Sequence, residues 1–182
     1  MGDLATHCGR VAGGLAAGVV AVPDGRWEPP APCDGWTAQR VARRVVEGRG
    51  RFLQLIDLTV PEGPSVDDDL AGAWTATRDV VRAAVEDPGV AHLEYASESM
   101  GTATFEHGNQ VFATFDPFVH TWDPARAAGL YETLDPDEVD RAYQRRPMGE
   151  IHQEPGLCGL ELEPPPGADE QTSPLSCRGR RV

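Results

Sequence analysis

The stretch FATFDPFVHTWDPARAAG, residues 112–129, decides the predicted fold and the predicted site of this chain. Its apolar residues recur at helical spacing and extend a stripe that begins at Phe105, which predicts a helix with one buried face. Asp116 and His120 stand four residues apart, so on a helix they lie one turn apart on the same face. A carboxylate and an imidazole at this spacing are competent to hold one metal ion or one substrate. The alternative is an ordinary surface aspartate beside a partly buried histidine.

Two prolines bear on the course of this helix. Pro117 removes a backbone donor, so the helix is expected to bend or loosen there. Asp123 followed by Pro124 has the pattern of a helix cap and a first helical residue, which predicts a restart that stops at Gly129. The sequence therefore predicts one helix from about residue 104 through residue 120, followed by a shorter continuation.

The remaining elements follow from apolar periodicity and from turn residues. Further helices are predicted over residues 3–22, 38–58, 70–85 and 134–146, with Thr37 as the cap of the second. Residues 90–104 have no clear period and are predicted to form a loop or a weak strand. Proline and glycine dominate after Pro147, so residues 147–182 are predicted to be an irregular tail. At 182 residues the whole chain, 1–182, is expected to be a single domain.

The helix predicted over residues 38–58 carries an anomaly. Its inner face is expected to read Val41, residue 44, Val45, Gly48, Phe52, Leu55 and Ile56, and residue 44 is arginine. Burying an arginine is costly unless it meets an acceptor, so an anionic group is expected opposite Arg44. The alternative is that Arg44 lies at the margin of the face and extends its long side chain to solvent.

Composition narrows the classes of partner. The formal net charge is −13 and every one of the 16 basic residues is arginine, a balance that disfavours nucleic acid. No apolar run is long enough to cross a membrane and no leader pattern is present, so a cytoplasmic protein is expected. The cysteines have no paired spacing and are expected to be free thiols, with Cys33 a packing residue; they are Cys8, Cys33, Cys158 and Cys177.

Three motifs, in this order, resemble the actinobacterial DinB-like metal-binding proteins and their relative, the N-terminal domain of mycothiol-dependent maleylpyruvate isomerase. They are W-x-x-P-x-P-C-x-G-W-T over residues 27–37, FVHTWDPARAAG over residues 118–129, and P-x-G-A-D-E-Q-T over residues 165–172 followed by Gly179-Arg180. The resemblance covers nearly the whole chain. It implies an all-α, up-and-down four-helix bundle with an extra helix, and a zinc or nickel ion held at one end by three side chains.

The ligands that this resemblance implies fall on residue 44, Asp116 and His120. The chain departs from the pattern at residue 44, where arginine stands in place of histidine, and a guanidinium has no lone pair for a metal. Either another residue completes the metal site, or Arg44 takes the place of the metal and pairs with Asp116. In the second case His120 is a free imidazole, able to act as a general acid or base.

These expectations lead to three interpretations of function. The first is an enzyme of the thiol-dependent isomerase or transferase type, with or without a metal, which performs isomerase, lyase or cyclase chemistry on a small molecule. Mycothiol is the thiol cofactor that the resemblance implies. The second is a non-catalytic binding or accessory protein on a scaffold whose metal site has decayed, and the third is an interaction module. The oligomeric state is left open between a monomer and a homodimer.

Overall fold

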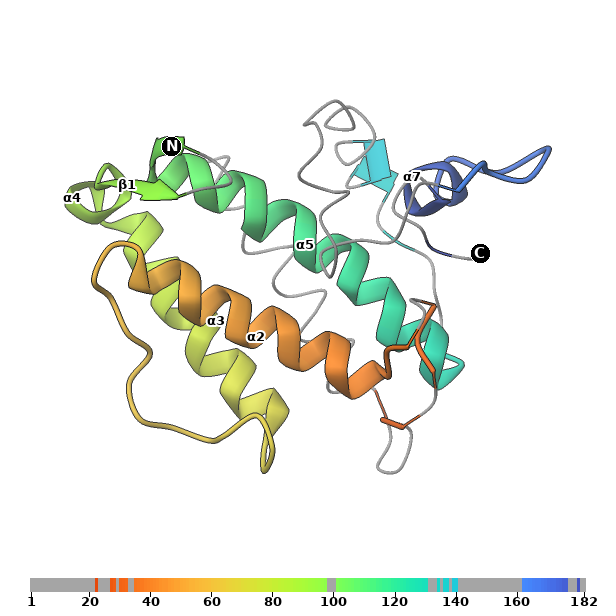
Figure 1. The fold of residues 1–182 in the computed structure, drawn as a ribbon, viewed down its shortest axis with the longest axis horizontal. Coiled ribbons are helices and arrows are strands. Elements are labelled where there is room, and N and C mark those ends of the chain that lie inside the picture. The colour runs from red at the N-terminus through yellow and green to blue at the C-terminus, as the bar shows by residue number, and fades with distance from the viewer. Residues whose placement is uncertain are drawn as a thin grey trace. The chain divides into compact units, whose positions relative to one another are not determined.

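The computed structural model describes residues 22, 27–28, 30–32, 35–97, 101–130, 134, 136–137, 139–140, 162–176 and 180, without the side chains of residues 111–121, 124 and 174. The helix predicted over residues 3–22 therefore lies outside the described residues, apart from Val22. The described part contains five helices and one two-stranded sheet (Figure 1). They are α2 (Ala38–Gln54), α3 (Leu70–Glu86), α4 (Pro88–Ala91), β1 (Glu94–Ser97), β2 (Gly101–Thr104), α5 (Phe105–Ala128) and α7 (Thr172–Ser176).

The chain forms two compact units, each built from two stretches of sequence. Unit 1 comprises residues 1–21 and 42–121, and unit 2 comprises residues 22–41 and 122–182. Helices α2 and α5 each continue from one unit into the other. Among the described residues, no helix combines the length and the apolar character that crossing a lipid bilayer requires.

Helix α2 begins where the sequence predicts and ends earlier. The N–H of Arg40 donates to the hydroxyl of Thr37 at 3.3 Å, which confirms Thr37 as the cap. The helix ends at Gln54, and Asp57 then takes a φ of 59°, a left-handed conformation that stops helical hydrogen bonding. The prediction of helix as far as residue 58 was therefore too long.

Helix α3 is confirmed almost to the residue. Asp69 caps it by accepting the N–H of Gly72 at 2.8 Å, and Trp74, Thr77 and Val81 on its inner face are buried. A cap followed by apolar residues at helical spacing is a strong local signal, and the tertiary structure agrees with it.

The prediction of an all-α four-helix bundle was wrong, because a β-hairpin stands between the third and fourth predicted helices. Strands β1 and β2 pair antiparallel, with Tyr95 opposite Ala103. Gly101 enters β2 with a φ of 66°, a conformation that glycine adopts without strain. Tyr95 is buried while its neighbours in β1 are more exposed, so the hairpin forms by placing one aromatic side chain in the core.

Helix α5 runs as one helix from Phe105 to Ala128, through Pro117 and Pro124. The predicted restart at Asp123 was therefore wrong. Asp123 does not cap a new helix. It lies within α5, and its buried carboxylate binds Arg180. A tertiary partner far along the chain has overridden a local capping signal. The helix ends at Gly129, as predicted, where φ is 69°.

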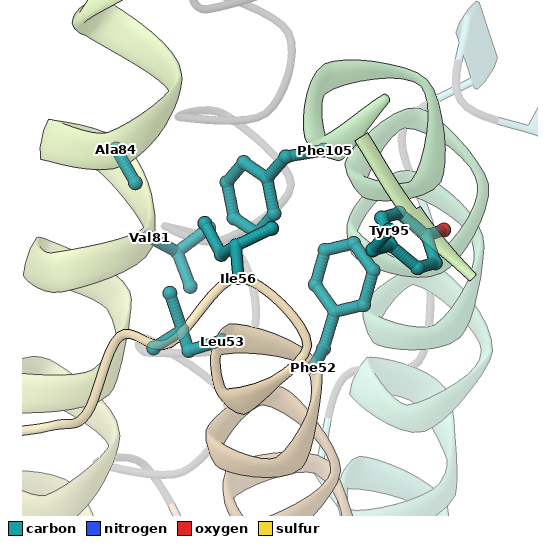
Figure 2. Close-up of a cluster of buried hydrophobic side chains, with 7 residues drawn as sticks. All are labelled: Phe52, Leu53, Ile56, Val81, Ala84, Tyr95 and Phe105. Carbon is teal, nitrogen blue, oxygen red and sulfur yellow. The ribbon is translucent and has the colours of Figure 1, made fainter. Parts of the chain in front are cut away.

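The described core of unit 1 lies where the end of α2, the end of α3, the hairpin and the start of α5 meet. Figure 2 shows its side chains converging from these elements. The ring of Phe52 stacks on Phe105 with centroids 4.9 Å apart and meets Tyr95 edge to face at 5.5 Å. The seven buried members are Phe52, Leu53, Ile56, Val81, Ala84, Tyr95 and Phe105.

The predicted irregular tail contains a short helix in unit 2. Helix α7 buries Leu175 completely, and the N–H of Leu162 donates to the carbonyl of Ser176 at 2.9 Å. The side chain of Gln171 accepts the N–H of Leu134 at 2.7 Å. Of the helix predicted over residues 134–146, the described residues 136–137 and 139–140 are helical.

Candidate functional site

The buried face of α2 is rotated by about one residue from the predicted one. The buried residues include Val41, Ala42, Val45, Val46, Arg49, Phe52, Leu53 and Ile56, whereas Leu55, predicted to face inward, is 42% exposed. Arg44 consequently lies at the margin of this face and is half-buried. This marginal position is the alternative that the sequence left open for Arg44.

The arginine beside it, Arg43, is held by carboxylates. Its Nη1 donates to Asp67 Oδ2 at 3.4 Å, its Nη2 bonds the other oxygen of Asp67, and Glu47 Oε1 lies 3.7 Å from Nη1. The hydrogen bond from Arg43 lowers the pKa of Asp67, and the same bond raises the pKa of Arg43. These contacts tie residue 67, in the loop between α2 and α3, to the turn of α2 that carries Arg44.

The backbone of α5 places Asp116 and His120 as the sequence predicts. Both positions lie inside the continuous helix, so they are one turn apart along it. Their side chains lie outside the described residues, and the predicted pairing of Asp116 with Arg44 stays a prediction.

One contact between α2 and α5 shows which residues of the two helices lie beside each other at that point. Phe52, near the end of α2, lies against Phe105 and Gly108 in the first turn of α5, and the two helices run in opposite directions (Figure 1). Eight residues back along α2 lead to Arg44, and eight residues forward along α5 lead to residues 113–116. Each step covers about 12 Å. Counted from this contact, equal steps along the two antiparallel helices therefore lead to Arg44 on α2 and to the turn that ends at Asp116 on α5.

Arg49 on α2 is buried, and it was not predicted to be a site or core residue. Arg49 is 8% exposed and its guanidinium lies over the ring of Trp74 on α3, 4.9 Å from the ring centroid. Asn109, in the first turns of α5, is also buried. The helical period that places Val45 and Phe52 inward also places residue 49 inward, and that periodicity was the signal that could have found Arg49.

A buried ion pair lies in unit 2. Arg180 Nε donates to Asp123 Oδ1 at 3.1 Å, and Arg180 Nη2 donates to Asp123 Oδ2 at 2.8 Å. This parallel, two-bond geometry is the strongest form of an arginine–carboxylate interaction. Both side chains are almost fully excluded from solvent, at 1% and 0% exposure. From the sequence, Asp123 is predicted to be a cap and Arg180 has no predicted role, because residues so far apart carry no local signal.

The donor set at residues 44, 116 and 120 does not fit a zinc or nickel site. An arginine offers no lone pair, so only Asp116 and His120 remain, whereas such sites normally use at least three protein ligands. Elsewhere in the described part of the chain, no three His, Cys, Asp or Glu side chains are grouped to hold one ion. Asp116 and His120 are not among these residues, because their side chains are not described.

Comparison with known proteins adds no relative. The chain matches no family model, no curated protein and no solved structure.

Proposed function

We propose that this chain is an enzyme of the thiol-dependent isomerase or transferase type, which acts without a metal on a small anionic molecule. The proposed site comprises Arg44 on α2 and Asp116 and His120 on α5. The proposal extends the motif resemblance to the DinB-like proteins, with mycothiol as the candidate thiol. The cytoplasm is the proposed location, since free thiols and a thiol cofactor belong to a reducing compartment.

One observation carries this proposal. Counted from the contact of Phe52 with Gly108, equal steps along the two antiparallel helices lead to Arg44 and to the turn that ends at Asp116, which supports placing them in one site. A cation and a carboxylate on neighbouring helices at one level are suited to form an ion pair, and His120 follows one turn further along α5. The half-buried position of Arg44 supports the same assignment, since a substrate needs access to the guanidinium.

The chemistry follows from the three residue types. The guanidinium of Arg44 has five N–H donors, enough to hold Asp116 and a substrate carboxylate or enolate together. The imidazole of His120 takes a proton from the substrate and returns it at another atom, the role of a general acid and base near neutral pH. One cation that stabilises an enolate and one base suffice for isomerase, lyase or cyclase chemistry.

The register is tested by restoring a metal ligand. Arg44→His is expected to bind about one Zn²⁺ per chain through residues 44, 116 and 120, because the proposed site then offers the three donors that a zinc site needs. The measurement is calorimetric titration with zinc chloride, with the metal content determined by elemental analysis. Arg51→His is the matched control, because Arg51 lies on the same helix and its side chain is 64% exposed. Absence of zinc binding in Arg44→His would show that the three positions do not converge.

The metal-free part of the proposal has its own test. Wild-type protein as purified is expected to contain no stoichiometric zinc or nickel. If elemental analysis finds one ion per chain, another residue completes the site and Arg44 does not replace the metal.

The substrate class is tested with maleate as the binding probe and maleylpyruvate as the substrate, the latter with mycothiol. Arg44→Gln is expected to weaken maleate binding by at least about tenfold, since it removes the cation. His120→Gln is expected to keep maleate binding and to lose the absorbance change of isomerisation. Maleate binding without turnover in wild-type protein would favour the alternative, a non-catalytic binding protein. Absence of binding would contradict the proposed site.

A further inference from the structure

The buried ion pair of unit 2 joins two segments that are far apart in the sequence. Asp123 lies within α5, whereas Arg180 lies 57 residues further on, close to the last residue of the chain. The two residues belong to separate motifs, FVHTWDPARAAG and Gly179-Arg180, and the structure brings Asp123 and Arg180 together. The pair therefore joins Arg180 to α5.

Arg180 is itself held by the segment before it. Its backbone N–H donates to the carbonyl of Leu175 at 3.1 Å, and Leu175 is fully buried. Two further hydrogen bonds hold this segment. The N–H of Leu162 donates to the carbonyl of Ser176, and the N–H of Leu134 donates to the side chain of Gln171. Arg180 thus reaches Asp123 from a docked segment, and losing either partner would leave a charge buried without its counter-charge.

We propose that Arg180 and the segment 162–176 before it form a latch that holds the last two turns of α5 in helical form through the pair between Arg180 and Asp123. These turns also bury Trp122, Ala125 and Ala128, and the Asp123 carboxylate beside them needs the guanidinium of Arg180 as its counter-charge. Docking of the segment and order in residues 122–128 are therefore coupled.

The latch also bears on the proposed site, and this second step rests on the proposed function. His120 lies three residues before Asp123 on the same helix, so a change in the order of residues 122–128 displaces the turn that carries His120. Arg180 is in this sense a positioning residue for His120, and it makes no contact with the substrate.

The latch is tested by amide hydrogen exchange in the full chain. Arg180→Lys keeps the charge and loses the two-bond geometry, so exchange of residues 122–128 is expected to accelerate by about 10- to 100-fold. Arg126→Lys is the matched control, because Arg126 also lies on the last turns of α5, is exposed, and covers the ring of Trp122. Unchanged exchange in residues 122–128, or an equal acceleration of these amides in Arg126→Lys, would overturn the latch.

A double variant with two neutral residues keeps the test valid if the single variant fails to fold. Arg180→Gln alone strands the Asp123 carboxylate, whereas the double variant Asp123→Asn/Arg180→Gln leaves no buried charge. The double variant is expected to exchange more slowly in residues 122–128 than Arg180→Gln does. Exchange as fast as in the single variant would show that the ion pair is not what holds the helix end.

The step toward His120 is tested with Co²⁺ as a spectroscopic probe. In Arg44→His, visible absorption of bound Co²⁺ reports the geometry of residues 44, 116 and 120, and adding Arg180→Lys is expected to weaken binding by about tenfold. Equal binding in both proteins would overturn the positioning role. Absence of Co²⁺ binding in Arg44→His itself would contradict the proposed site, while the latch would still be judged by exchange.

Discussion

At the scale of single residues, Gly108 shows how closely α5 approaches the aromatic cluster. A Cβ at this position would lie 2.8 Å from Phe52 Cζ and would overlap the hydroxyl of Tyr95. Gly108→Ala is therefore expected to lower the free energy of unfolding by about 1–3 kcal/mol, because the rings must move. Helix propensity acts in the opposite direction by up to about 1 kcal/mol. Urea denaturation measures the net change.

The control for this substitution lies on α2. A Cβ at Gly50 would have no neighbour within 4 Å, so Gly50→Ala is expected to stabilise the protein by about 0.5–1 kcal/mol through helix propensity alone. Adding Tyr95→Phe to Gly108→Ala removes the overlapping oxygen and is expected to recover part of the loss. If Gly108→Ala is as stable as Gly50→Ala, the close approach does not constrain the fold.

Arg44 and Arg49 of α2 show what could be predicted for single residues. The helical period of α2 was predicted correctly, but the direction of its buried face was not. The sequence predicted Gly48 as an inner residue, because glycine is less costly to bury than arginine. In the structure Arg49 is buried instead, with its guanidinium over the ring of Trp74. Arg44 takes the marginal position that was its alternative. Phase depends on the partner helix, which local sequence does not contain.

At the scale of elements, the short helix α7 depends on the cap of Asp169. Its Oδ1 accepts the N–H of Thr172 at 2.7 Å, and the hydrogen bonds from Thr172 lower the pKa of Asp169. A lowered pKa means that the carboxylate contributes stability above the pKa of the unfolded chain, and that this contribution is lost as the pH falls through the folded value. Asp169→Ala is therefore expected to cost about 1 kcal/mol at pH 7, and clearly less below about pH 3.

The measurement compares the urea midpoints of wild-type protein and variant at both pH values. Asp169→Asn keeps an acceptor for Thr172 without the charge, so its stability relative to wild-type protein is expected to improve as the pH falls. Glu170→Gln, at the exposed neighbouring position, controls for removal of an acidic residue from the same turn. An equal deficit of Asp169→Ala at both pH values would show that the charge of the carboxylate does not contribute.

The elements that were predicted well are those whose signals are local. Helix α3 has a cap and a regular apolar face, and both α2 and α3 begin where the sequence placed them. The weak strand that was one prediction for residues 90–104 is confirmed, but its pairing into a hairpin was not predicted, because both strands have four residues and only Tyr95 is buried. The break in α5 was predicted wrongly because the partner of Asp123 lies 57 residues away. Short strands and distant ion pairs are decided by tertiary contacts.

At the scale of the whole molecule, the sequence predicted which helices carry the candidate site residues and how these residues are spaced along them. The i, i+4 spacing of Asp116 and His120 is confirmed on the backbone of α5, since a continuous helix fixes it. The pairing with Arg44 depends on the phase and register of two helices, and only the register is supplied by the contact at Phe52. Sequence alone contains neither quantity, because both arise from packing between segments far apart in the chain.

The division into two compact units leads to a prediction about cooperativity. Because α2 and α5 each continue through both units, unfolding of unit 2 removes turns from helices on which unit 1 depends. We therefore expect one unfolding transition. Leu175→Ala, which creates a cavity in unit 2, is expected to lower the stability of both units equally, by about 2–5 kcal/mol.

Fluorine-labelled tryptophan gives each unit its own signal in a urea titration followed by NMR. Trp74 reports on unit 1 and Trp122 on unit 2. Both resonances are expected to shift to the same lower midpoint in Leu175→Ala, and likewise in the matched variant Val81→Ala of the unit 1 core. If Leu175→Ala moves the Trp122 midpoint alone, the shared helices do not couple the units, since turns of α5 would then melt in unit 2 without cost to unit 1.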